Sequence, residues 1–369
     1  MKKTGFFYDE RCMWHVGQLY AGIFPVGGWV QPSNGTGLAE APDTKRRLKS
    51  LMDVSGLLAM LEQRSAKPAT ETQLMRIHPQ SFLHRFKLLS EKTGGDIGHE
   101  ASFGHGGYEI AKISAGLAIA GIDAVIRLEV KNAYILSRPP GHHCLPDQGM
   151  GFCLLANIPL AIEEAIATHK LSRIAVLDWD VHHGNGTEAI YLERADVLTI
   201  SIHQENCFPI GSGLAQMRGQ GKGLGYNLNI PLLPGSGDQA YRDAFELLVK
   251  PALRKYKPEL IIVASGLDAN ALDPLARMML HSESYRWMTT EIMALADEMC
   301  SGRLAIVHEG GYSESYVPFC GQALIEQLAG MKTGVADPAL DFIKAQQPNA
   351  GFQAYQRGLL EAQAKAAKL

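Results

Sequence analysis

Several apolar runs rich in β-branched residues recur along this chain, and polar or ionisable residues follow them. Runs such as 260–264 show no alternation of polar and apolar side chains, which is typical of strands covered on both faces. Segments with helical patterns separate these runs, and alternation of strands with helices indicates parallel strands joined by crossovers. The sequence therefore predicts an α/β fold with a central, mostly parallel β-sheet flanked by helices.

The expected elements cover most of the chain after residue 100. Strands are predicted at 132–137, 173–180, 197–203, 259–265 and 303–308, and helices at 107–120, 158–168, 239–256, 285–299 and 323–328. No linker rich in Pro, Gly or Ser divides the 369 residues, and no internal repeat is present. We therefore predict one catalytic domain over 1–369, with a core at about 7–330, a C-terminal extension at 331–369 and a surface helix at 353–369.

Composition narrows the class of protein. A hydrophobic fraction of 46% suffices for a large core, and a net charge of -3 gives no basic footprint, so we expect no nucleic-acid partner. No apolar run is long enough to cross a bilayer and no signal-peptide pattern is present, so we expect a cytoplasmic protein without a membrane partner. The six cysteines form no Cys-x-x-Cys pair, which argues against a structural zinc knuckle and against a disulfide framework.

The segment 178–185, read DWDVHHGN, follows a predicted strand. Because side chains alternate along a strand, Asp178, Asp180 and His182 should share one face. Asp268 follows another predicted strand, and parallel strands present their carboxyl ends at one edge of the sheet, where ligands bind. Buried carboxylates require partners. Two oxygens and one nitrogen from Asp180, His182 and Asp268 leave a coordination position open, which predicts a catalytic metal ion such as zinc.

Two adjacent histidines, His142 and His143, end the motif RPPGHH after another strand. The prolines and the glycine fix a rigid turn, and imidazoles titrate near neutrality, which suits acid–base chemistry. We predict that Asp178 orients His142 and that Asn185 orients His143. Because a carboxylate favours the imidazolium more than an amide does, His143 is the expected proton carrier.

Aromatic residues complete the predicted site. Tyr312 follows two glycines after the strand at 303–308, and a protonated phenol can donate to an oxyanion. Phe152 and Phe208 follow loops at strand ends and could form a narrow apolar slot, with core packing as the competing interpretation.

With these residues assembled, the chain closely resembles the zinc-dependent histone deacetylase superfamily, and most of all its bacterial, class II-like histone deacetylase-like amidohydrolases. The motifs that carry the resemblance are RPPGHH, GFC, LDWDVHHGNGT, TISIHQ, GYNLNIPL, SGLDANALDPLARM and EGGYS. The resemblance runs from about residue 7 to 330 and is most specific from 137 to 313.

The resemblance implies an arginase/deacetylase-like fold with the active site at the carboxyl ends of the strands. It implies Zn²⁺ on Asp180, His182 and Asp268. Catalytic roles fall to His142, His143 and Tyr312, with Asp178 and Asn185 behind the histidines, and the walls of an acyl-lysine tunnel come from Phe152, Phe208, Gly151 and Leu275. The family also implies K⁺ at two sites, the first on Asp178, Asp180, His182, Ser201 and Ile202 and the second on Tyr191, Arg194, Val197 and Tyr226.

Three positions bear on specificity. Asn185 replaces an aspartate of class I relatives, as in class II. The loop that carries a substrate-gripping acid in the family offers Glu100 or Asp96 here. Relatives specialised for acetylpolyamines carry a gatekeeper glutamate after an Asp-Pro pair, and Leu275 stands there, which disfavours that preference.

The expected function is therefore removal of acetyl or other acyl groups from acyl-lysine, in a protein or peptide, by a metal-activated water. A deacetylase of small acylated amines such as acetylpolyamines is the main alternative. An arginase-like ureohydrolase is less favoured because Asn270 stands where a second metal-binding aspartate would be needed. An inert acyl-lysine binding protein is less favoured because the reactive residues are complete. The C-terminal tail could contact a second subunit, which leaves a homo-oligomer open.

Overall fold

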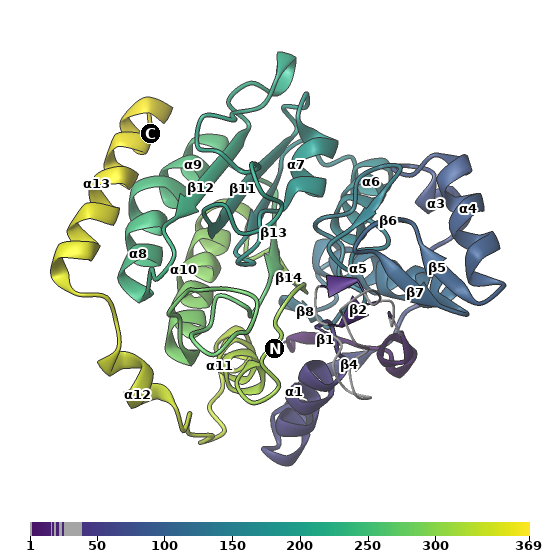
Figure 1. The fold of residues 1–369 in the computed structure, drawn as a ribbon, viewed down its shortest axis with the longest axis horizontal. Coiled ribbons are helices and arrows are strands. Elements are labelled where there is room, and N and C mark those ends of the chain that lie inside the picture. The colour runs from purple at the N-terminus through teal and green to yellow at the C-terminus, as the bar shows by residue number, and fades with distance from the viewer. Residues whose placement is uncertain (1, 16, 18–19, 22–23, 26–38) are drawn as a thin grey trace.

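The computed structural model describes residues 2–15, 17, 20–21, 24–25 and 39–369, and its centre is one eight-stranded sheet (Figure 1). The strand order is β12-β11-β10-β13-β14-β8-β1-β4, and all neighbouring pairs in it are parallel. The strands are β1 (Gly5–Phe7), β4 (Glu62–Arg64), β8 (Ala133–Ile135), β10 (Ile174–Asp178), β11 (Val197–Gln204), β12 (Asn227–Leu232), β13 (Leu260–Ser265) and β14 (Leu304–His308). The predicted α/β class and parallel sheet are confirmed.

Three of these strands, β1, β4 and β12, were not predicted. The edge strand β4 reads Glu-Gln-Arg, and β12 contains two asparagines and a proline, so neither shows the continuous apolar run that marks a covered strand. Three two-stranded pairs lie outside the large sheet: β2 (Tyr20–Ala21) with β3 (Phe24–Pro25), β5 (Gly94–Asp96) with β7 (Ser102–Gly104), and β6 (Gly98–His99) with β9 (Gly149–Met150).

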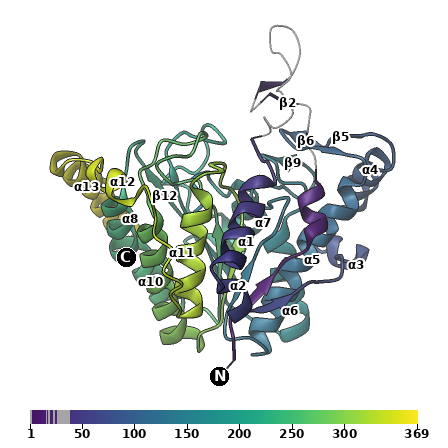
Figure 2. The ribbon, with the colours of Figure 1, turned by 90° about the horizontal axis from the view of Figure 1, so that it is seen from below.

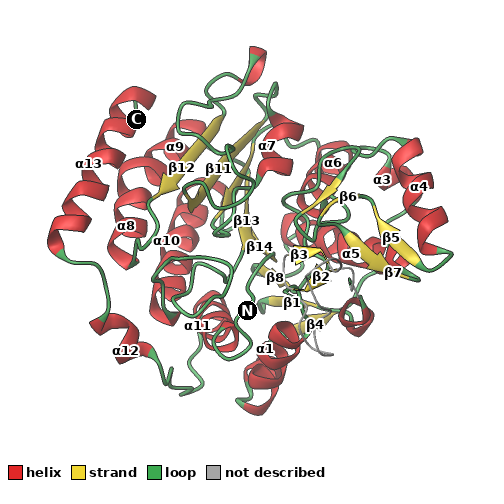
Figure 3. Cartoon of the chain, viewed as in Figure 1, coloured by secondary structure: helices red, strands yellow, loops and turns green. Residues whose placement is uncertain are grey.

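Helices surround the sheet (Figure 3). They are α1 (Asp43–Val54), α2 (Leu57–Met60), α3 (Glu71–Leu74), α4 (Gln80–Ser90), α5 (Gly107–Ile126), α6 (Asn157–His169), α7 (Asn185–Tyr191), α8 (Asp238–Ala244), α9 (Lys250–Tyr256), α10 (Ser282–Cys300), α11 (Val317–Ala329), α12 (Leu340–Ala345) and α13 (Ala350–Ala367). The five predicted helices fall within this set; the one expected at 239–256 is α8 and α9 joined by a π-helical turn, Phe245–Val249.

Alternate residues of the strands bury opposite faces of the sheet. On β10, Ile174 and Val176 join the apolar cluster that contains α5 and α6, whereas Ala175 and Leu177 join the cluster that contains α1, α10 and α11. Figure 2 shows these two groups of helices on opposite sides of the strands. Covered on both faces, the sheet offers its strand ends, not its faces, for a functional site.

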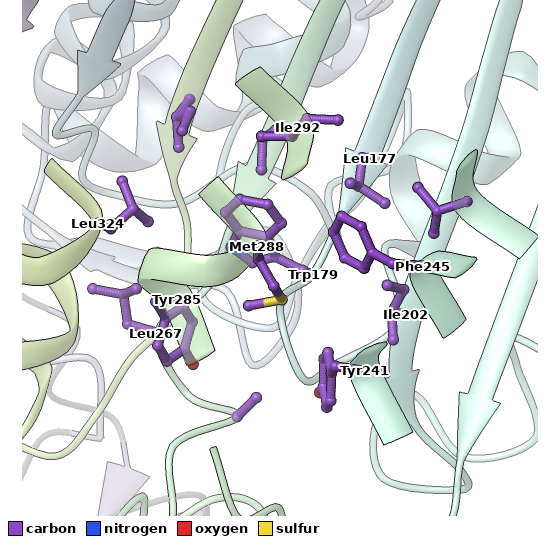
Figure 4. Close-up of a cluster of buried hydrophobic side chains, with 14 of the residues drawn as sticks. Leu177, Trp179, Ile202, Tyr241, Phe245, Leu267, Tyr285, Met288, Ile292 and Leu324 are labelled. Atoms are coloured by element: carbon purple, nitrogen blue, oxygen red, sulfur yellow. The ribbon is translucent and has the colours of Figure 1, made fainter. Parts of the chain in front are cut away.

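The core reaches directly to the strand end that precedes the metal motif. In Figure 4, Trp179 lies among Leu177, Phe245 and Met288. Its side chain is fully buried, and its indole N–H donates to Ser265 Oγ at 2.9 Å. Because Trp179 is held in the core, its neighbours Asp178 and Asp180 are held at fixed positions beside it.

The C-terminal extension packs on the domain and does not project from it. Ile343 of α12 and Leu360 of α13 belong to the main apolar cluster, and Gln356 Oε1 accepts the backbone N–H of Leu233 at 2.9 Å. The helix predicted at 353–369 is α13. Among the described helices, none combines the length and the apolar character that a membrane span requires.

Candidate active site

The carboxyl ends of β10 and β13 bring together three side chains that could hold a metal ion. Strand β10 ends at Asp178, two residues earlier than predicted, so Asp180 and His182 lie in the loop that follows. His182 Nδ1 lies 3.1 Å from Asp180 Oδ1 and 3.3 Å from Asp268 Oδ2. All three residues are buried, and one ligand atom of each lies within 4.8 Å of the others.

The charges of this trio call for a cation. Burial, together with the Asp180 carboxylate, raises the pKa of Asp268 to about 6. Burial alone would raise the pKa of Asp180 as well, but the imidazoles of His142 and His182 lower it. Apart from the His182 ring nitrogen at 3.3 Å, the buried Asp268 Oδ2 has no hydrogen-bond donor among the described residues. Two oxygens and one nitrogen fit a divalent ion with an open coordination position.

Two glycines leave the space that such an ion needs. A Cβ at Gly310 would overlap Asp268 Oδ2, and a Cβ at Gly266 would overlap Asp180 Oδ2. The backbone N–H of Gly310 donates to Asp180 Oδ2 at 2.8 Å. The residues present therefore fit a bound metal ion.

Beside the trio, the two adjacent histidines pair with different partners. His142 Nδ1 lies 2.9 Å from Asp178 Oδ2, and His143 Nδ1 lies 2.7 Å from Asn185 Oδ1. Burial would lower the pKa of His142, but the carboxylates of Asp180 and Asp178 raise it to about 10. Burial and the charges of His142 and His182 hold the pKa of His143 well below its usual 6.5. The pKa values of the two adjacent histidines are thus shifted in opposite directions, upwards for His142 and downwards for His143.

Two acidic residues that the sequence did not single out position this machinery. Glu309 Oε2 accepts the backbone N–H groups of Gly141 at 2.6 Å and His142 at 3.1 Å, which fixes the histidine turn. Asp273 accepts the backbone N–H groups of Tyr312 and Leu275 at 2.8 and 2.9 Å. Their long-range contacts reveal this role.

A pocket of about 200 Å³ leads to the trio. Its lining residues are Glu100, His143, Gly151, Phe152, His182, Cys207, Phe208, Pro274, Leu275, Arg277 and Tyr312. The predicted tunnel residues therefore do line one pocket, and Cys207, Pro274 and Arg277 are additions that the sequence did not indicate.

The pocket walls are aromatic. The ring of Phe208 lies 5.0 Å from that of His143, and the ring of Phe152 lies 5.9 Å from that of Tyr312. Gly151 has φ +52°, and a Cβ there would clash with the ring of Phe208. Burial and the nearby Asp268 and Asp180 raise the pKa of Tyr312 well above 10, so its hydroxyl remains protonated and can donate.

Comparison with known proteins agrees with this geometry. The family model described as "Histone deacetylase domain" matches residues 39–328. The chain belongs to the histone deacetylase family. A histone deacetylase-like amidohydrolase of Pseudomonas aeruginosa is 59% identical over 360 residues, which cover 98% of this chain and 95% of that protein. The resemblance stated from the motifs is confirmed, and with it a hydrolase of this family.

More distant members extend the comparison. A probable deacetylase of Archaeoglobus fulgidus is 37% identical over 263 residues, covering 71% of this chain and 72% of that protein. Among solved structures, the HDA15 HD domain superposes with a TM-score of 0.81 at 27% identity, covering 99% of this chain and 100% of that one. The predicted deacetylase-like fold is confirmed.

Asp96 and Glu100, the two candidates for the acid that grips the substrate, differ in position within this histone deacetylase fold. Asp96 accepts the backbone N–H groups of Gly98 and Ala101 at 2.8 and 3.2 Å, so its carboxylate serves the local turn. Glu100 lines the pocket, and burial raises its pKa. Glu100 is therefore the better candidate for contact with a substrate.

The residues predicted to bind potassium lie on or near β11, those of the first site beside the candidate active site and those of the second at the amino end of the strand. Asp178 and Ser201 are register partners on β10 and β11, and Ile202 follows Ser201 on β11. For the second site, Val197 begins β11. The carbonyl oxygens of Tyr191 and Tyr226 accept the N–H groups of Arg194 and Thr199, each at 3.0 Å. Both potassium sites remain predictions.

Proposed function

We propose that this chain is a zinc-dependent amidohydrolase that removes acyl groups from acyl-lysine, with Zn²⁺ on Asp180, His182 and Asp268. One observation carries the proposal: His182 of the buried trio lines the same aromatic pocket as His143 and Tyr312. When bound, zinc would polarise the amide carbonyl and acidify a water molecule.

The neutral His143 is the proposed general base. Because Asn185 Oδ1 accepts from Nδ1, Nε2 is free to take the proton of the attacking water as its oxygen bonds to the carbonyl carbon. The same nitrogen then gives that proton to the lysine amine as the C–N bond breaks. The second proton of the water also passes to the amine, so the products are a carboxylate and a lysine ammonium group.

Tyr312 and His142 stabilise the negative charge that develops during the reaction. The Tyr312 hydroxyl donates to the oxyanion that develops on the carbonyl oxygen. The charged His142, held by Asp178 at 2.9 Å, adds positive charge beside the reacting centre and opposes protonation of His143.

The pocket favours an acylated lysine over a free one. Phe152 and Phe208 present apolar surface along the entry, and a charged ammonium would lose its hydration there without compensation. A neutral acyl-lysine stem meets no such cost, which supports acyl-lysine as the substrate.

A small acylated amine is the second candidate because of Glu100. This carboxylate lines the pocket, and it makes no ion pair in the described part of the chain, so it could hold an ammonium group of a polyamine. The side chain of Asn270 makes a local hydrogen bond, in which Nδ2 donates to Leu267 O at 2.6 Å. This contact gives no support to a binuclear, arginase-like metal centre.

We also propose K⁺ at the two family positions, with Asp178, Ser201 and Ile202 contributing to the first and Tyr191, Arg194, Val197 and Tyr226 to the second. Exchange of potassium for tetramethylammonium at constant ionic strength should change turnover. An unchanged rate and an unchanged Tm would contradict both sites.

The decisive experiment is a hydrolysis panel on zinc-loaded protein. We expect turnover of acetyl- and longer acyl-lysine peptides, slower turnover of acetylpolyamines, one metal ion per chain and loss of activity after chelation. Faster turnover of polyamines would favour the second candidate. Two metal ions per chain, or a zinc-loaded protein inert towards every acyl-lysine, would overturn the proposal.

A further inference from the structure

A second cavity of about 540 Å³ lies at the opposite end of the sheet from the candidate active site. Tyr226 immediately precedes β12, and Leu198 and Leu228 are the second residues of β11 and β12, so the cavity opens at the amino ends of these strands. Helix α9 and the end of α13 close its other sides, near the C label of Figure 1. Its size lies within the range of roughly 300–1,000 Å³ that is usual for small-molecule sites.

The floor of this cavity is apolar. Leu198, Leu228 and Ala252 line it, and their side chains belong to the main apolar cluster. Tyr226 and Tyr256 form a wall, with ring centroids 5.8 Å apart and planes at 69°. Leu224, which is 67% exposed, also lines the cavity, and contact of an alkyl or aryl group with this side chain and the two tyrosine rings removes apolar area from water.

The charged side chains that line the cavity are all cationic. Arg173, Arg218, Lys255 and Lys368 all line the cavity, and the side chains that line it include no aspartate or glutamate. Within the described residues, none of these four cations lies within ion-pair distance of a carboxylate. Glu259, which is adjacent in space, accepts the backbone N–H groups of Ser172 and Arg173 at 2.8 and 3.0 Å, not the guanidinium.

Arg218 and Arg173 are also held in position. Arg218 Nε donates to Asn227 O at 3.2 Å, and Arg173 Nε donates to Lys257 O at 2.9 Å. The terminal nitrogens of Arg218 have no partner among the described residues. A tethered guanidinium with both terminal nitrogens free matches the two oxygens of a carboxylate. Burial lowers the pKa of Arg218, which is the expected cost of leaving this charge without an anion.

We propose that this cavity binds an amphipathic carboxylate of the medium-chain fatty acid class, with its head group on Arg218 and its chain against Leu224, Tyr226 and Tyr256. Lys255 faces the same cavity and adds to the attraction. The carboxylate head is favoured by the free guanidinium fork, and the alkyl chain by Leu224 and the two tyrosine rings. This inference does not depend on the proposed deacylation.

The test is calorimetric titration of the full-length, zinc-loaded protein with decanoate. We expect saturable binding, and weaker binding by about tenfold or more in Arg218→Gln and in Lys255→Gln, since loss of a charge-assisted contact costs at least about one factor of ten. The matched control is Arg254→Gln, because Arg254 neighbours Lys255 on α9 but pairs with Glu298 at 2.9 Å. Decanol, with the same chain and no charge, should bind at least tenfold more weakly.

Lys255→Gln keeps the proposal testable if Arg218→Gln fails to fold, because Lys255 is exposed and its one hydrogen bond, to Lys368 O at 3.4 Å, is long. A second binding event that persists in both variants would be assigned to the active-site pocket. Equal isotherms for the native protein and both variants, or no saturable binding to the native protein, would overturn the proposal.

Discussion

Two adjacent histidines beside the Asp180, His182 and Asp268 trio have the same side chain but different hydrogen-bond partners. On one side, His142 faces the carboxylate of Asp178; on the other, His143 faces the amide of Asn185. The two rings are adjacent, with centroids 3.9 Å apart, and both are buried. Yet the pKa of His142 is raised to about 10 and that of His143 is lowered well below 6.5.

The difference shows how neighbouring imidazoles can be given separate tasks. Two buried cations in contact would repel each other, so the proton settles on the ring that has carboxylates around it. That charge then keeps the second ring neutral and able to accept a proton. The following variants remove or exchange the partners that create this asymmetry.

The largest effect is expected on the neutral side. His143→Ala removes the proposed general base, and kcat on a good acyl-lysine amide should fall towards the upper end of the range of about 10²–10⁴-fold that acid–base catalysis supplies. Zinc content should be unchanged, because His143 is not in the metal-binding trio. His84→Ala, at an exposed position of α4, is the control, and substantial residual turnover in His143→Ala would move the base elsewhere.

The next largest effect is expected for Tyr312, the proposed hydrogen-bond donor to the oxyanion. Tyr312→Phe removes one hydrogen bond to the developing oxyanion, and kcat should fall by about 10²–10³-fold with little change in KM. Steady-state assays on one acyl-lysine peptide measure kcat and KM. Tyr355→Phe, on the exposed face of α13, is the matched control. Near-native turnover would exclude Tyr312 from the reaction.

The residues behind these two predictions were visible in the sequence for a physical reason. His143, Tyr312 and the metal trio each follow a buried strand of a parallel sheet, and the geometry of such a sheet gathers strand ends at one edge. Knowledge of the strands therefore sufficed to group residues that lie far apart in the chain. The contacts of His142 with Asp178 and of His143 with Asn185 could be predicted in the same way.

Other features could not be predicted because no local pattern encodes them. Glu309 accepts a backbone N–H group of the histidine turn from 168 positions away along the chain. Because every residue except proline carries a backbone N–H group, the sequence does not mark this contact. The cationic cavity is assembled from single residues at 173, 218, 255 and 368, each of which looks like an ordinary surface charge. Strand β12 was missed because its asparagines serve Glu188, with Nδ2 of Asn229 donating at 2.6 Å, instead of adding to an apolar run.

A smaller effect is expected on the charged side. Asp178→Asn replaces a charge-assisted hydrogen bond by a neutral one, a loss of about 1.5–3 kcal/mol, and kcat should fall by about 10–100-fold. Without this carboxylate the pKa of His142 falls below about 10, so the alkaline limb of the pH–rate profile should move to lower pH. Asp53→Asn, exposed on α1, is the control; an unmoved alkaline limb would show that Asp178 does not hold the proton on His142.

The smallest effect, and the sharpest comparison, comes from giving both histidines the same partner. Asn185→Asp places a carboxylate beside His143 Nδ1, at the position of an oxygen now 2.7 Å away, and so raises the pKa of that imidazole. Because the base must be neutral to accept a proton, the acidic limb of kcat/KM should move to higher pH by about one unit, while the rate on the plateau changes by less than about tenfold. Asn349→Asp adds the same charge at the N-cap of α13, where aspartate caps equally well, and should leave the profile in place. If the acidic limb of Asn185→Asp coincided with that of the native protein, the amide would not be what separates the two histidines, and the asymmetry would have to come from the carboxylates of Asp178 and Asp180 beside His142.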